Sequence, residues 1–201
     1  MERLPSRKRA LDIGCAVGRS SFEMAMIFEE TVGIDYSEVF VGAASQINLK
    51  GQFPFKMQET GTIMRDMVAT RPTGITGRIS FEQGDAQNLR PDLGTFDCVL
   101  AANLLCRLQK PVAFLRCLPR LLCPGGQLIL TTPNTWLEDF TAREYWLGAT
   151  PETGEPLEAI KAELEGHFSL DATWDMPFLI REHRRKYQWS VAQASRWIRM
   201  H

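Results

Sequence analysis

Short apolar runs alternate with longer amphipathic runs along most of the chain. Ser37 is a suitable N-cap for the second amphipathic run, and Pro111 suits the first turn of the third. Strands that alternate with helices along a chain form parallel, doubly wound sheets. The pattern therefore predicts an α/β, Rossmann-like fold. The predicted strands are residues 10–13, 31–34, 78–83, 96–102 and 127–132, and the predicted helices are residues 19–30, 37–50, 111–122 and 157–166.

The C-terminal part of the chain has a different pattern. Residues 168–181 and 187–199 are predicted to be two strands joined by a short charged turn. Consecutive strands with a short connection must be antiparallel. We therefore expect a seven-stranded sheet that is mostly parallel and ends in an antiparallel C-terminal hairpin.

Two stretches rich in glycine and proline interrupt the alternation, at about residues 51–77 and 133–156. Long loops without structure of their own are uncommon in compact domains. We expect the first stretch to be a hairpin followed by a loop that packs over another part of the molecule. Neither an internal repeat nor a second domain boundary is apparent, so residues 1–201 are predicted to form a single domain with two insertions.

Composition excludes several classes of protein. The 201 residues have a formal net charge of -1, and a nucleic-acid-binding protein usually has a basic excess. One local basic cluster, residues 181–186, also contains Glu182 and is expected to be a solvated turn or one edge of a substrate site. The charged N-terminus does not resemble a signal peptide, and no apolar run approaches the ~18 residues of a membrane span. We expect a cytoplasmic protein that binds neither nucleic acid nor membrane.

The cysteines and histidines do not predict a metal site. No two of the five cysteines have the spacing of a metal-binding pair, and the three histidines are scattered far from them. The cysteines are expected to be reduced and mostly buried.

The strongest local motif is the turn at residues 11–19, where a predicted strand leads into a helix through small residues. Gly14, Ala16 and Gly18 would let a ligand approach the backbone closely. A nicotinamide-dinucleotide turn would need glycine at positions 16 and 19, where this chain has Ala16 and Arg19. The spacing therefore argues against a dinucleotide.

Three acidic residues stand at the predicted ends of successive parallel strands, which is the edge where open α/β sheets bind ligands. Asp12 can reach an ammonium group directly or through water, and Asp35 can accept hydrogen bonds from two ribose hydroxyls. Asp85 can accept from the exocyclic amine of adenine, with the backbone at Ala86 facing the ring. Each acid alone could equally be a helix cap; together they predict a site for a nucleoside that carries an amino acid.

These motifs resemble class I S-adenosylmethionine-dependent methyltransferases over about residues 10–132. A closer resemblance, to the methyltransferases that act on 4-mercaptohistidine (5-thiohistidine) in ovothiol biosynthesis, covers nearly the whole chain. This resemblance rests on residues 10–23, 101–104, 135–148 and 177–182, and the last two blocks are more specific than the cofactor motifs. The resemblance implies methylation of an imidazole ring nitrogen, and a functional pairing with the sulfoxide synthase to which this domain is often fused. The expected cofactor-binding residues are Asp12, Gly14, Cys15, Ala16, Gly18, Asp35, Tyr36, Ser37, Asp85, Ala86, Asn103 and Leu104.

Methyl transfer from a sulfonium is an in-line displacement in which positioning contributes most, ~7–11 kcal/mol. A neutral imidazole nitrogen already has a lone pair, so a general base is not obligatory. Asn103, after the fourth predicted strand, is the expected catalytic residue, because it can hydrogen-bond a ring nitrogen or the substrate amine. An arginine suits the substrate carboxylate. The expected acceptor-binding residues are Asn103, Arg107, Trp136, Glu144, Arg181 and Tyr187, although each can instead have a packing or surface role.

Two other functions fit the same motifs. The chain can be a class I methyltransferase for another small metabolite, or a non-catalytic S-adenosylmethionine-binding partner domain. The sequence does not determine the oligomeric state.

Overall fold

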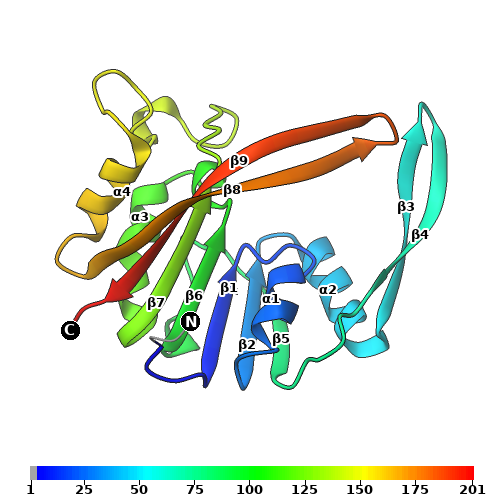
Figure 1. The fold of residues 1–201 in the computed structure, drawn as a ribbon, viewed down its shortest axis with the longest axis horizontal. Helices are drawn as coiled ribbons and strands as arrows, with labels where there is room; N and C mark the ends of the chain where they lie inside the picture. Colours follow the sequence, from blue (N-terminus) through cyan, green and yellow to red (C-terminus); the bar gives the residue numbers. More distant parts are fainter. Residues whose placement is uncertain (1–3) are drawn as a thin grey trace.

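A computed structural model describes residues 4–201, which form a seven-stranded sheet with helices on both faces (Figure 1). The strand order is β5-β2-β1-β6-β7-β9-β8; neighbours pair in parallel from β5 to β7, and β9 is antiparallel to both β7 and β8. The predicted fold class is confirmed. The strands of this sheet are β1 (Arg9–Ile13), β2 (Glu30–Asp35), β5 (Arg78–Gln83), β6 (Phe96–Ala102), β7 (Leu122–Thr132), β8 (Phe168–His183) and β9 (Lys186–Arg199).

Alternate residues of the central strands face two separate apolar layers. Leu11 of β1 packs in the larger layer with α3 (Pro111–Cys117) and α4 (Pro156–Leu164), whereas Ala10 packs with Met24 of α1 (Arg19–Met24). The remaining helix, α2 (Glu38–Lys50), begins at Ser37, whose hydroxyl accepts a hydrogen bond from the Phe40 amide as predicted. This arrangement leaves the C-terminal ends of the parallel strands together at one edge.

Three predicted boundaries are wrong. The first helix was expected to reach residue 30 but ends at Met24, because the Ala25 carbonyl accepts from the Gly77 amide and the chain turns into β2. The helix expected at 111–122 ends at Cys117 in a short 3-10 turn, Leu118–Arg120. The strand expected at 127–132 begins earlier, at Leu122, so residues 124–126 lie inside β7 at an irregularity of its pairing with β6.

The first insertion is the predicted hairpin, made of β3 (Gln52–Thr60) and β4 (Ile63–Thr70), and residues 71–77 lead on to β5. Its tip meets the end of the β8–β9 hairpin, which runs well beyond the sheet (Figure 1). The pairing of β7 with β9 ends at Gln193, so residues 175–192 form a two-stranded ribbon, here called the arm. At the contact, Arg181 of the arm donates to Glu59 of β3 over 3.1 Å.

The cysteines are all free, and Cys15, Cys98 and Cys106 are buried, as expected. No helix among residues 4–201 is both long and apolar enough to cross a membrane.

Candidate active site

The turn between β1 and α1 is fixed to the end of β2 by its own backbone. The amides of Gly14 and Cys15 both donate to the Ile34 carbonyl, over 2.7 and 3.0 Å. Gly14 has a φ of +78°, and a Cβ there would lie 3.1 Å from the Leu104 side chain. The turn therefore brings its backbone to the C-terminal edge of the sheet, with Leu104 packed closely against it.

Asp35 ties this turn to the next helix. One of its carboxylate oxygens accepts from the Ala16 amide over 2.8 Å, and the other accepts from the Ser37 amide over 2.9 Å. The first bond holds Ala16 at a φ of 48°, a left-handed conformation that is uncommon outside glycine. Because a carboxylate has about four acceptor positions, Asp35 retains capacity for a ligand.

A cavity of about 480 Å³ lies at this edge, lined by the ends of β1 and β2 and by the loops that follow β1, β2, β5, β6 and β7. Two carboxylates, Asp35 and Asp85, line it. Asp85 is oriented by a bond from the Gln87 amide over 2.9 Å. The lining residues are Ile13, Gly14, Ile34, Asp35, Tyr36, Gly84, Asp85, Ala86, Gln87, Leu104, Arg107, Leu108, Gln109 and Phe140.

Asp12 lies behind the turn rather than on the cavity surface. Its side chain is 1% exposed and accepts a 2.6 Å hydrogen bond from the Ser21 hydroxyl. Burial raises its pKa to about 6, although the bond from Ser21 opposes that shift. Contact between Asp12 and the ammonium group of a ligand therefore stays a prediction.

Gly18 and Cys15 of the turn both pack against the protein interior. Close approach of a ligand was expected at Gly18. A Cβ there would lie 2.6 Å from the Phe81 ring, so the Phe81 side chain, and not a ligand, occupies the space beside this glycine. Cys15 is 5% exposed, and burial raises the pKa of its thiol well above the usual range. Burial thus favours the protonated thiol, and contact between Cys15 and a cofactor stays a prediction.

Asn103, the expected catalytic residue, follows β6 with a φ of 55°. Its backbone amide donates to the Thr131 carbonyl over 2.8 Å, and its side-chain oxygen accepts from the Thr131 hydroxyl over 2.9 Å. The side-chain amide group is the part left to donate to a ligand. Asn103 adjoins the lining residue Leu104 but does not itself line the cavity.

Among residues 4–201, Arg107 is the one arginine that lines the cavity. One terminal nitrogen of its guanidinium donates to the carbonyls of Cys106 and Thr135, over 3.0 and 3.1 Å. The guanidinium also lies over the Phe140 ring, 4.7 Å from its centroid. Two carbonyls and one ring thus hold the group in place while its other nitrogens remain available to an anion.

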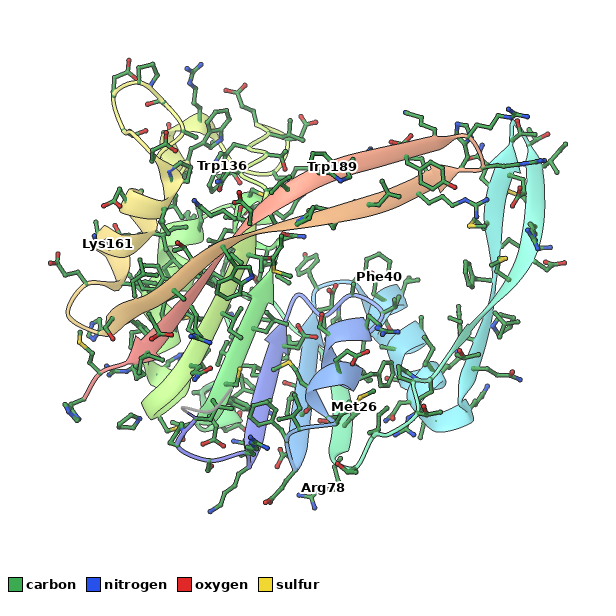
Figure 2. All side chains as sticks on the ribbon, viewed as in Figure 1. Met26, Phe40, Arg78, Trp136, Lys161 and Trp189 are labelled. Atoms are coloured by element: carbon green, nitrogen blue, oxygen red, sulfur yellow. The ribbon has the colours of Figure 1, made fainter. Side chains whose placement is uncertain are left out.

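Like Asn103, the other four expected acceptor-binding residues are not among the lining residues of the cavity. Trp136 is 8% exposed, because it stacks on Trp146 and joins the main core. Figure 2 labels it near the end of β7. Glu144 is exposed in a short 3-10 turn, and Arg181 and Tyr187 lie at the far end of the arm. Their role in acceptor binding stays a prediction.

Sequence reasoning also missed part of the cavity wall. Phe140 comes from the second insertion, where the sequence analysis singled out Trp136 and Glu144 instead. Gln87, Leu108 and Gln109 lie just after motifs that were recognised. These residues could have been proposed from the sequence, because they lie within two positions of Asp85 and Arg107 along the chain.

Comparison with known proteins decides the family. A model described as a methyltransferase domain matches residues 1–188. The chain belongs to the methyltransferase domain family. The predicted enzyme class is confirmed at this level.

Two curated sequence relatives share 27% and 31% identity with this methyltransferase. The ubiquinone biosynthesis O-methyltransferase of Dechloromonas aromatica (strain RCB) is 27% identical over 150 residues, which cover 72% of this chain and 54% of that relative. The tRNA U34 carboxymethyltransferase of Idiomarina loihiensis is 31% identical over 131 residues, covering 63% and 33% of the two chains. The chain thus spans about half the length, or less, of these curated relatives.

Solved structures show the same fold. A SAM-dependent methyltransferase from Methanosarcina mazei has a TM-score of 0.68 at 18% identity, with 99% of this chain and 95% of that chain covered. The N-methyltransferase NodS from Bradyrhizobium japonicum, solved with S-adenosyl-L-homocysteine, has a TM-score of 0.60 at 15% identity, with 96% and 78% covered. The methyltransferase described here therefore has the fold of S-adenosylmethionine-dependent methyltransferases.

Proposed function

We propose that this methyltransferase uses S-adenosylmethionine to methylate an imidazole ring nitrogen of a small amino acid, with 5-thiohistidine as the first candidate. The observation that carries the proposal is the composition of the cavity wall. Among residues 4–201, those lining the cavity include two aspartates, one arginine and no histidine or lysine. This wall suits an acceptor that needs to be held but not deprotonated.

The methyl donor fits the part of the cavity that is lined by Asp35, Asp85 and Ala86. The Asp35 carboxylate is fixed by two backbone amides, as bidentate recognition of ribose hydroxyls requires. Asp85 and Ala86 supply a carboxylate and a backbone group beside it for the adenine ring. S-adenosylmethionine, when bound, supplies an electrophilic methyl carbon. The chain's own contribution is to orient the donor and to exclude water around it.

Arg107 supports an acceptor that carries a carboxylate. Its guanidinium is held over Phe140 and against two carbonyls, so little conformational entropy is lost when it binds an anion. An α-amino acid anchored there would present its side chain to the same cavity. Asn103 can then donate its side-chain amide to the acceptor.

Selectivity is the main demand of this reaction. The sulfur of a thiohistidine is a better nucleophile than its ring nitrogen, so the site must direct the nitrogen at the methyl carbon and keep the sulfur away. Positioning by Arg107 and Asn103 supplies that control, because rate in a displacement depends on alignment of the reacting atoms.

A second candidate is O-methylation of a phenol, which the name of the ubiquinone biosynthesis relative favours. A phenol must lose its proton during transfer. The carboxylates on the wall are the available bases, and the proposal assigns both of them to the donor.

Purified protein incubated with labelled S-adenosylmethionine and a panel of acceptors separates these functions. We expect label on a ring nitrogen of 5-thiohistidine. Label on sulfur, or on phenols alone, contradicts the proposed acceptor. Binding of S-adenosylhomocysteine in calorimetry without transfer to any acceptor would identify a non-catalytic binding domain instead.

Arg107→Ala tests the acceptor half separately. The acceptor KM is expected to rise about tenfold to hundredfold, because a charge-assisted pair is lost, while affinity for S-adenosylhomocysteine changes little. Arg107→Lys should recover only part of the loss. Arg116→Ala is the matched control, since Arg116 pairs with Glu163 away from the cavity. Equal effects of the Arg107 and Arg116 variants would refute the anchoring role.

A further inference from the structure

The arm exposes an unusual amount of apolar surface. Over the length of the arm, β8 and β9 pair only with each other. A ribbon of two strands is marginally stable in water unless another surface covers one of its faces. Exposed apolar patches of this kind mark interaction sites. The exposed large apolar residues of the arm are Met176, Leu179, Ile180, Tyr187, Trp189 and Val191.

Strand register places most of these side chains on one face. Leu179 lies directly opposite Trp189, Pro177 opposite Val191, and Arg181 opposite Tyr187. Directly opposite residues of a hairpin project to the same side, so these pairs share a face that we call the Trp189 face. Met176 and Ile180 project to the other side. Trp189, 67% exposed, is the most exposed apolar side chain of the arm, where it is labelled in Figure 2.

Charge differs sharply between the two ends of the arm. Its tip, residues 181–186, carries three arginines and one lysine against one glutamate. Arg181 pairs with Glu59 and Lys186 with Glu182 in the same chain, so Arg184 and Arg185 are the cations assigned to a partner. The segment that follows β7 beside the base of the arm, residues 138–158, carries six acidic side chains against one arginine (Figure 1). The tip and the base segment are therefore complementary in charge, but they lie at opposite ends of the same ribbon and cannot meet within one molecule.

We propose that the Trp189 face is a dimer interface on which a second copy of this chain packs its own arm in the antiparallel direction. A two-fold axis through the middle of the arm brings identical apolar faces together, as an isologous interface requires. The same operation places the basic tip of each copy over the acidic base segment of the other. One symmetric arrangement thus covers the apolar face and pairs both charged ends.

The size of the surface shows why both kinds of contact are needed. The arm is about 25 Å long, from some eight residues per strand at about 3.3 Å each. Its apolar face offers on the order of 400 Å² per copy, since one fully buried aromatic side chain contributes ~150–250 Å². A standard interface buries about 800 Å² per partner, so the two contacts between tip and base segment must supply the remainder.

Sedimentation equilibrium and light scattering of the full chain test this assembly. Wild type is expected to be a dimer that dissociates on dilution, and Trp189→Glu is expected to be a monomer at the same concentrations. Met176→Glu, on the opposite face of the arm, should leave the dimer intact and is the matched control. A wild type that stays monomeric at every concentration, or an equal effect of the two variants, overturns the proposal.

Charge reversal tests the direction in which the arms pack. Arg184→Glu with Arg185→Glu should raise the dimer dissociation constant at least tenfold at low salt, and less at high salt because salt screens exposed charges. Adding Glu155→Lys and Glu158→Lys should restore the dimer. If the second pair of substitutions weakens the dimer further, the tips do not meet the base segments. Circular dichroism of each variant separates dissociation from unfolding.

Discussion

The cofactor edge and the arm are held in place by different kinds of contact. At the edge, Asp35 and Ile34 bind the turn through backbone amides that lie within about twenty residues along the chain. The arm is anchored at its tip by Arg181 and Glu59, which are 122 residues apart. The first arrangement is preorganised by a short motif, whereas the second depends on a long-range contact between two exposed hairpins. The preorganised edge around Asp35 is the region proposed to bind the cofactor. The exposed arm is the region proposed to bind a second copy of the chain.

The largest predicted effect concerns the preorganised edge. Asp35→Ala removes the acceptor of two backbone amides and a carboxylate from the cavity wall. Affinity for S-adenosylhomocysteine should fall about a thousandfold, or about 4 kcal/mol, since each charged hydrogen bond contributes about 1.5–3 kcal/mol. Calorimetric titration measures it. Glu38→Ala, an exposed neighbour in the first turn of α2, is the control, and a loss below about tenfold would show that Asp35 is not a ligand contact.

The second prediction concerns the buried carboxylate behind the edge. Asp12 has a pKa of about 6 in the folded protein, against 3.8 as its ordinary value. Between these values the folded state holds a proton that the unfolded state has lost, so the free energy of unfolding falls as pH rises through this window. The loss is complete above the folded pKa and amounts to about 3 kcal/mol.

Asp12→Asn removes this titration while keeping an oxygen that can accept from Ser21. In urea unfolding, the difference in stability between variant and wild type should shift in favour of the variant by about 3 kcal/mol from about pH 4 to about pH 7. Ser21→Ala serves as a comparison that keeps the ionisable group. Parallel pH profiles for wild type and Asp12→Asn would mean that the folded state does not disfavour the Asp12 carboxylate.

The same contrast explains what could be predicted from the sequence. The strands, the first hairpin and the turn around Gly14 follow from local periodicity and from residues close together in sequence, and they are confirmed. The early end of α1 was missed because it depends on a bond from Gly77, more than fifty residues away. Phe81 filling the space at Gly18 was missed for the same reason. The two strands of the arm were predicted. Their extension beyond the sheet was not, because the sequence does not show that the pairing of β9 with β7 ends at Gln193.

The third prediction tests the packing that supports the turn. Gly18→Ala places a Cβ at a φ of +87° and 2.6 Å from Phe81, so the free energy of unfolding should fall by about 2 kcal/mol. Gly18→Ala with Phe81→Leu should recover part of that loss. Gly42→Ala is the control, because nothing lies within 4 Å of its Cβ and alanine favours the helix by about 1 kcal/mol. If both alanine variants had the same stability, Gly18 would not be constrained by Phe81.

The smallest predicted effect lies at the tip of the arm. Arg181→Ala removes the ion pair with Glu59, whose members are 33% and 16% exposed, so global stability should change by less than about 1 kcal/mol. Hydrogen exchange of residues 175–192 should nevertheless become faster, because the pair closes the contact between two hairpins that otherwise meet at few points. Lys56→Ala, which breaks an exposed ion pair with Asp66 inside the β3–β4 hairpin, is the control and should leave the arm unchanged. A local change without a global one would show that the arm opens independently of the sheet, whereas unchanged exchange would mean that the ribbon is held by its apolar face and not by its tip.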